Sequence, residues 1–205
     1  MEKIIFQTYP HFYMRMDKFI KENESIKQCD ICFLGDSLTE MFDVSDYDYN
    51  RVCINRGIVS DKSAGVLMTL DDRVIAINPK KVFLLIGSND ICDGYPILEI
   101  TNNIKDIIYY LKSKLKKVDI VISTVLPPCY YKASHVDSIY PDCRDINRIK
   151  ALNENIRKLE GVTIFDGFKL FADENDSLSL EDTLDGVHLT KSAYDKLKKS
   201  LRKIL

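Results

Sequence analysis

The chain has 205 residues, 45% of them hydrophobic, which is enough for one globular domain over residues 1–205 with a core of ordinary size. Its 29 basic and 31 acidic residues give a formal charge of -2, which excludes the strong positive field that binding to nucleic acid or anionic lipid requires. The charged first residues and the short uncharged stretches predict a cytoplasmic protein with no membrane span.

The six cysteines occur without a secretory signal, so we expect free thiols and not a disulfide framework. Cys29 and Cys32 form a C-x-x-C, but no second pair completes a zinc site. Because this pair leads into a predicted strand, where residues three apart point to opposite faces, the two thiols should diverge. We predict no metal site and no cofactor.

Weak helical periodicity over residues 10–27 precedes the first of five apolar, β-branched runs, which we interpret as strands. These strands are ICFL (31–34), RVCI (51–54), KVFLLI (81–86), DIVISTVL (119–126) and VTIF (162–165). Apolar residues at helical spacing predict helices at 66–75 (stopped by Pro79), 97–115, 146–159 (ended by Gly161) and from Thr190 onward. Continuous apolar strands that alternate with helices indicate a parallel sheet covered on both faces, a three-layer α/β/α sandwich.

Two segments at the C-terminal side of this pattern stand out. The last helix carries a basic face, which we expect to be solvated: Lys196, Lys198, Lys199, Arg202 and Lys203. Residues 127–145 have no helical or strand period, and loops of this length in compact domains are often lids or binding walls. An ordered surface excursion is the alternative interpretation of this loop.

Short polar segments follow the predicted strands and also precede the last helix. Ligands of parallel α/β sheets bind beyond the carboxyl ends of the strands, so these segments predict the functional edge of the sheet. They are residues 35–37, residues 55–61, residues 87–90, and the turn LDGVHLT that holds Asp185 and His188.

The residue types at this edge fit nucleophilic attack on a carbonyl group. The Ser37 hydroxyl attacks only if a base takes its proton, and His188 is the candidate base. Asp185, three residues earlier, can hold the imidazole in one tautomer. The N–H of Ser37, the side-chain amide of Asn89 and a backbone N–H of the second polar segment are candidate donors to an oxyanion.

Each of these pieces is weak by itself. A Gly-Asp-Ser tripeptide is commonly a turn, Asn89 and Asp90 could cap a helix, and a lone histidine is more often structural than catalytic. Their joint occurrence at the predicted functional edge favours the catalytic interpretation of Ser37 over the helix-cap interpretation.

Four segments resemble the sequence blocks of the SGNH hydrolases, also called GDSL esterases and lipases: GDSL (35–38), NRGIVSD (55–61), GSND (87–90) and DGVHL (185–189). They occur in the family's order, and the chain is most similar to the small single-domain acetylhydrolase-like branch. The resemblance implies a flavodoxin-like fold with a five-stranded parallel sheet. It also implies Ser37 as nucleophile, His188 as base, Asp185 as its orienting acid and Asn89 in the oxyanion hole.

One position departs from the family pattern. Where many members have a glycine whose N–H donates to the oxyanion, this chain has Ser60, which keeps the N–H but loses glycine's freedom at positive φ. A second feature excludes another fold: Thr39 replaces the second glycine of a G-x-S-x-G elbow, which argues against an α/β-hydrolase.

These observations predict a serine esterase that hydrolyses short-chain acyl esters, with an O-acetylated sugar as a candidate substrate. Asp36, Tyr131 and Tyr140 are the candidate substrate-binding residues, although the loop tyrosines could equally pack the loop. The alternatives are a lysophospholipase or thioesterase, an acyltransferase that uses the same acyl-enzyme, and an inactive module that binds acylated sugars. The sequence leaves the oligomeric state open.

Overall fold

The protein is described by a computed structural model that covers residues 10–45, 47–48 and 50–205. The predicted single domain includes residues outside these ranges and stays a prediction. No helix of the described ranges is long and apolar enough to cross a membrane.

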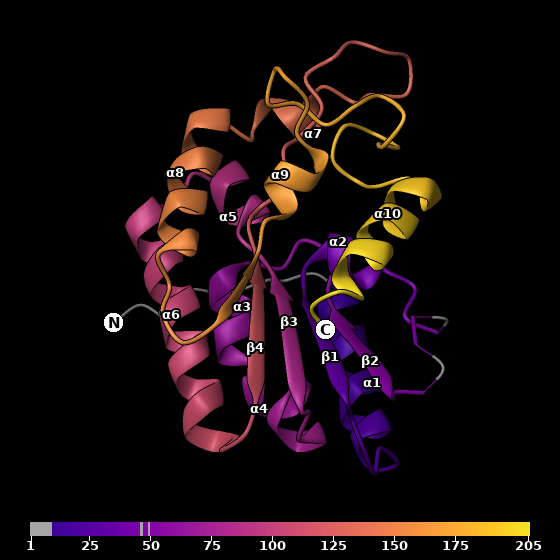
Figure 1. Ribbon diagram of the computed structural model, residues 1–205, viewed down its shortest axis with the longest axis vertical. Helices are drawn as coiled ribbons and strands as arrows, with labels where there is room; N and C mark the ends of the chain where they lie inside the picture. Colours follow the sequence, from indigo (N-terminus) through magenta and orange to yellow (C-terminus); the bar gives the residue numbers. More distant parts are fainter. Residues whose placement is uncertain (1–9, 46, 49) are drawn as a thin grey trace.

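Five parallel strands form one sheet in the order β2-β1-β3-β4-β5. This is the flavodoxin-like order, so the predicted fold class is confirmed. The strands are β1 (Ile31–Gly35), β2 (Cys53–Gly57), β3 (Lys81–Leu85), β4 (Asp119–Ser123) and β5 (Thr163–Phe165). Figure 1 shows the sheet at the centre, with helices in front of it and behind it.

Helices connect the strands and cover both faces of the sheet. The longer ones are α1 (Pro10–Asn23), α6 (Ile97–Lys114), α8 (Ile146–Arg157) and α10 (Lys191–Leu201). The shorter ones are α2 (Ser37–Glu40), α3 (Ser63–Met68), α4 (Leu70–Arg73), η1 (Ile75–Ile77), α5 (Ser88–Cys92), α7 (Ile139–Asp142) and α9 (Gly167–Phe171).

Two apolar clusters fill the space between the sheet and its helices. Strand β1 contributes to both, because its side chains alternate: Cys32 and Leu34 join the cluster with α3, α4, α6 and α8. Ile31 and Phe33 join the cluster with α2 and α10. This two-sided burial explains why the strands are almost uniformly apolar.

Three sequence predictions about elements need correction. The single helix expected at 66–75 is divided into α3, α4 and η1. The loop 127–145, expected to lack periodic structure, contains the short helix α7. On the basic face of α10, Lys198 is buried and its ammonium group lies over the Phe42 ring, so this face is only partly solvated.

The predictions for the cysteines are partly wrong. Cys92 and Cys143, expected as free thiols, form a disulfide, while Cys29, Cys32, Cys53 and Cys129 are free. Cys29 and Cys32 do not diverge to opposite faces; both lie in one apolar cluster, because Cys29 precedes β1 and does not follow its alternation. Burial raises the pKa of both thiols, which favours the unreactive protonated form.

Candidate active site

The nucleophile candidate Ser37 is the first residue of α2, and one residue, Asp36, separates it from β1. Asp36 caps this short helix, because its carboxylate accepts a hydrogen bond from the Leu38 N–H at 3.0 Å. Gly57 of β2 lets α2 lie against the sheet, since a Cβ there would come within 2.2 Å of the Glu40 nitrogen. The turn and the close contact fix the position of Ser37, which is only 7% exposed.

The turn that carries Asp185 and His188 is held by hydrogen bonds within it and by the loop 127–145. Inside the turn, the Thr183 hydroxyl accepts from the Gly186 N–H at 2.8 Å. Gly186 has φ +106°, which favours glycine, and its carbonyl accepts from the Cys129 N–H at 2.7 Å. Figure 1 shows the two segments side by side at the end of the molecule toward which the strands run.

Ser37, His188 and Asp185 form a continuous chain of hydrogen bonds. The His188 Nε2 atom lies 2.9 Å from the Ser37 Oγ, and the His188 Nδ1 atom lies 2.5 Å from the Asp185 Oδ2. An ionised carboxylate only accepts, so Nδ1 must donate to Asp185, which leaves Nε2 as the acceptor for the serine proton. In this tautomer His188 can deprotonate Ser37.

The electrostatics of Asp185 match this role. Partial burial opposes the negative charge, but hydrogen bonds from the His188 ring and from the N–H groups of His188 and Val187 outweigh it and lower the pKa of Asp185. Asp185 is therefore ionised at neutral pH and can stabilise the imidazolium that forms when His188 takes a proton.

The three candidate oxyanion donors lie after three neighbouring strands. The N–H of Ser37 has no acceptor among the described residues. The Asn89 Nδ2 donates to the Asp61 carbonyl at 3.0 Å, and the amide has a second hydrogen to donate. Ser60 lies in the turn after β2 with φ +61°, so serine adopts the left-handed backbone that glycine usually provides there.

Asp36, a candidate substrate-binding residue, is 2% exposed and caps α2. Burial raises the pKa of this carboxyl group to about 7, and the hydrogen bond from Leu38 acts in the opposite direction. In the structure, the Asp36 carboxylate therefore binds α2, the helix that carries Ser37.

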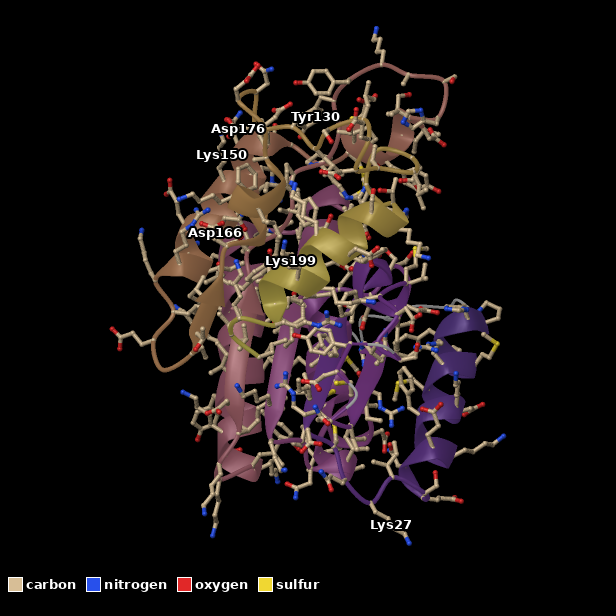
Figure 2. All side chains as sticks on the ribbon, turned by 45° about the vertical axis from the view of Figure 1, so that its right-hand side comes forward. Lys27, Tyr130, Lys150, Asp166, Asp176 and Lys199 are labelled. Carbon is tan, nitrogen blue, oxygen red and sulfur yellow. A yellow bond between two sulfur atoms is a disulfide. The ribbon has the colours of Figure 1, made fainter. Side chains whose placement is uncertain are left out.

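The loop tyrosines have different surroundings. The Tyr131 hydroxyl donates to Asp173 at 2.5 Å, and Tyr131 helps to line a 440 Å³ cavity with Lys132 and other loop residues. Tyr140 is 41% exposed, and its ring packs edge-on to the His188 ring, with centroids 6.0 Å apart. Tyr130 binds the Arg144 carbonyl and lies at the opposite end of the molecule from Lys27, which precedes β1 (Figure 2). Tyr140 therefore packs against the group formed by Ser37, His188 and Asp185.

Sequence reasoning missed Arg144, which lies in the loop between β4 and α8 and is 6% exposed. Its Nη2 donates to the Asn89 Oδ1 at 2.8 Å, and its Nε donates to the Ser88 hydroxyl at 2.7 Å. No sequence pattern signals this contact, because the loop has no period and Asn89 is 55 positions away.

Comparisons with known proteins identify the family and support the fold. The model of the GDSL-like lipase/acylhydrolase family matches residues 33–196. Platelet-activating factor acetylhydrolase IB subunit alpha2 of Gallus gallus is 23% identical over 186 residues, which cover 87% of this chain and 77% of that protein.

Solved structures are similar over most of their length. A Streptococcus pneumoniae protein whose name relates it to platelet activating factor has a TM-score of 0.85 and 26% identity, covering 94% of this chain and 92% of its own. The acetyl xylan esterase AlAXEase has a TM-score of 0.67 and 18% identity, covering 86% and 98%.

Proposed function

Because the chain belongs to the GDSL-like lipase/acylhydrolase family, a family of ester-hydrolysing enzymes, we propose that it is a serine esterase that hydrolyses short-chain acyl esters through an acyl-enzyme on Ser37. The observation that carries the proposal is the hydrogen-bonded chain from Ser37 through His188 to Asp185, with distances of 2.9 and 2.5 Å. Its substrate is a small-molecule ester.

In the proposed reaction, the Ser37 Oγ attacks the ester carbonyl carbon while His188 Nε2 takes the hydroxyl proton. The carbonyl oxygen becomes an oxyanion that accepts hydrogen bonds from the N–H groups of Ser37 and Ser60 and from the Asn89 side chain. The imidazolium then protonates the departing alcohol, which leaves the acyl group on Ser37. Water, deprotonated by His188, attacks the acyl carbon. The imidazolium then returns the proton to the Ser37 Oγ as the bond from Ser37 to the acyl group breaks and the acid leaves.

The direct test is hydrolysis of p-nitrophenyl acetate by the purified protein. We expect Ser37→Ala to lower kcat by at least about 10⁴-fold and His188→Ala to lower it by nearly as much, because residues that act as a unit are not additive. Ser113→Ala, on the exposed side of α6, serves as the matched control with unchanged activity. An organophosphonate that labels a serine other than Ser37 would contradict the proposal.

We propose that the acyl group is short, with acetyl favoured. The name of the Gallus gallus relative specifies an acetylhydrolase. In this chain, the loop 127–145 packs against the turn of Asp185, where the Asp137 N–H donates to the Asp185 carbonyl at 2.9 Å. A long acyl groove would contribute about 0.8 kcal/mol for each buried methylene. We therefore expect kcat/KM to fall from p-nitrophenyl acetate to the octanoate, whereas a steady rise would indicate a lipase or thioesterase.

On the alcohol side, we propose that an O-acetylated sugar packs against Tyr140, whose half-exposed ring lies beside His188. Tyr140→Ala should weaken hydrolysis of acetylated xylan more than hydrolysis of p-nitrophenyl acetate. Tyr131→Ala should instead lower the melting temperature and affect both substrates equally, because its hydroxyl binds Asp173. Equal effects of Tyr140→Ala on the two substrates would exclude the sugar contact.

A cytoplasmic location stays a prediction. The Cys92–Cys143 disulfide weighs against it, because the cytosol usually keeps protein thiols reduced.

A further inference from the structure

Arg144 is a buried cation that reaches the candidate oxyanion hole from the loop between β4 and α8. All three nitrogens of its guanidinium group donate hydrogen bonds: Nε to the Ser88 hydroxyl at 2.7 Å, Nη2 to the Asn89 Oδ1 at 2.8 Å and Nη1 to the Tyr140 carbonyl at 2.6 Å. Two of these acceptors are the first residues of α5. The guanidinium group therefore joins the loop to α5, the short helix after β3 that carries Asn89.

The contact with Arg144 determines how the Asn89 amide is oriented. Its Oδ1 accepts from the guanidinium group, and its Nδ2 donates to the Asp61 carbonyl at 3.0 Å. A flipped amide would place its NH₂ group against the donors of Arg144 and its oxygen against the Asp61 carbonyl, losing both hydrogen bonds. The second Nδ2 hydrogen thus has one fixed direction.

The charge on Arg144 adds to this effect. A charge-assisted hydrogen bond to Oδ1 draws electron density through the amide, which makes the Nδ2 hydrogens better donors. Burial lowers the pKa of Arg144, and the carboxylates of Asp36 and Asp185 act in the opposite direction. Because arginine keeps its charge in proteins, this polarisation does not depend on pH.

Both neighbours of Arg144 in the chain are anchored. Cys143 is joined to Cys92, the last residue of α5, by the disulfide. Asp145 caps α8 by accepting from the N–H groups of Asn147 and Arg148 at 2.8 and 3.0 Å. The backbone of Arg144 is thereby held beside the helix that carries Asn89.

We propose that Arg144 is a positioning residue of the oxyanion hole: it holds the Asn89 amide with one N–H directed at the oxyanion and strengthens that donor. The inference rests on the esterase function proposed above. Asn89 contacts the reacting oxygen, and Arg144 acts through it. The interaction matters in the transition state, where the negative charge develops, and little in the bound ester.

The test is a kinetic comparison of Arg144→Met and Arg144→Lys with p-nitrophenyl acetate. Misdirecting an oxyanion donor should lower kcat by about 10²-fold for Arg144→Met and change KM less than about threefold. Arg144→Lys keeps a charge but lacks the planar fork that donates to Ser88 and Asn89, so its kcat should fall between the wild type and Arg144→Met.

Arg148→Met is the matched control. Arg148 also ties α8 to α5, by donating to the Ile91 carbonyl at 3.1 Å, but it does not contact the Asn89 side chain. We expect a lowered melting temperature and an unchanged kcat for this variant. If Arg148→Met lowers kcat as much as Arg144→Met, the loss of kcat comes from weakened packing against α5 and not from the Asn89 amide, and the proposal is wrong.

A double-mutant cycle with Asn89→Ala separates positioning from general stability. Once the Asn89 amide is removed, Arg144→Met should cost no further kcat. An equal loss in both backgrounds would overturn the proposal, and the same criterion applies to Arg144→Lys if Arg144→Met does not fold. Wild-type protein without Ser37-dependent activity would overturn the esterase function itself, whereas an active wild type with full kcat in Arg144→Met would overturn only the role of Arg144.

Discussion

Ser60 has a left-handed backbone, with φ +61°, in the turn after β2. A side chain in this conformation costs about 1–2 kcal/mol, and glycine avoids the cost but adds about 0.4–1 kcal/mol of unfolded-state entropy. We therefore expect Ser60→Gly to be up to about 1.6 kcal/mol more stable. It should also keep its kcat, since only the N–H of this residue is proposed to act. Thermal unfolding and p-nitrophenyl acetate kinetics check both values. A large loss of kcat would assign a function to the Ser60 hydroxyl.

Because its pKa is raised, the buried Asp36 carboxyl group should make the free energy of unfolding depend on pH. Its pKa is raised by burial from 3.8 to about 7, so the folded protein binds this proton more tightly than the unfolded chain does. The resulting stabilisation is complete below pH 3.8 and is lost as the pH rises through about 7, an effect of about 4 kcal/mol.

Asp36→Asn removes this titration and keeps a good helix cap. The free energy of unfolding of Asp36→Asn, relative to that of the wild type, should therefore increase between pH 5 and pH 8, because only the wild type loses stability over this range. Urea unfolding at both pH values measures the difference. A difference that does not change with pH would show that Asp36 does not ionise in this range.

At the scale of single residues, the sequence indicated that Ser37, Asp185 and His188 gather at one edge of the sheet, because polar segments at the carboxyl ends of parallel strands meet there. The family motifs implied the same three residues, and their catalytic roles stay a prediction. Asp185 and His188 share one turn, and Ser37 follows a strand. Arg144 could not be predicted in the same way. Its acceptors are 55 and 56 positions away, and only the packing of the loop against α5 brings them together.

Helix α4 supplies a buried cation that joins the ends of two strands. Arg73 is fully buried; it pairs with Asp61 and donates to the Gly35 carbonyl of β1 at 3.0 Å and to the Arg56 carbonyl of β2 at 2.6 Å. Gly35 and Arg56 lie at the carboxyl ends of their strands, next to the segments that carry Ser37 and Ser60. By joining the two strand ends, α4 stabilises the functional edge of the sheet.

We expect Arg73→Met to lower the free energy of unfolding by about 3–5 kcal/mol, because it takes the ion-pair partner from a buried carboxylate. Lys80→Met is the control: Lys80 pairs with Asp30 but is 70% exposed, and such surface pairs contribute about 0–1 kcal/mol. Urea unfolding of both variants tests the comparison. Equal losses would show that burial does not increase the contribution of the Arg73–Asp61 ion pair to the free energy of unfolding.

At the scale of elements, apolar runs and helical spacing located four strands and the long helices, because burial on both faces produces a strong pattern. The second strand was predicted at 51–54 but lies at Cys53–Gly57, because its last residues, Asn55, Arg56 and Gly57, are not apolar. The prediction failed where tertiary contacts override it. The helix expected at 66–75 is interrupted at Thr69 and Val74, beside the contacts of Arg73 with the strand ends. Helix α7 has four residues, too few to show a period.

At the scale of the whole molecule, the family motifs implied a flavodoxin-like fold with five parallel strands, which the structure confirms. They carried no information about the Cys92–Cys143 disulfide. The two cysteines are 51 positions apart, and their pairing follows from the packing of the loop 127–145 against α5. Cysteine count and context alone favoured free thiols, which is correct for the other four.

We expect loss of the Cys92–Cys143 disulfide to destabilise the protein. In the entropic model, a disulfide that closes a chain segment of 51 residues destabilises the unfolded chain by about 4 kcal/mol, and disulfides typically stabilise proteins by about 2–4 kcal/mol. The free energy of unfolding of the double variant Cys92→Ser, Cys143→Ser should therefore be lower by about 2–4 kcal/mol. Its kcat should also fall, because Cys143 directly precedes Arg144, whose guanidinium group orients Asn89.

Dithiothreitol provides the matched experiment. It should lower the melting temperature of the wild type to that of the double variant and leave the double variant unchanged, since the reductant then has no bond to break. Thiol titration of the unfolded protein should count four reactive thiols before reduction and six after it, given six cysteines and one disulfide. Six thiols before reduction would show that the bond does not form, and Arg144 would then be held only by its hydrogen bonds and by the cap of α8.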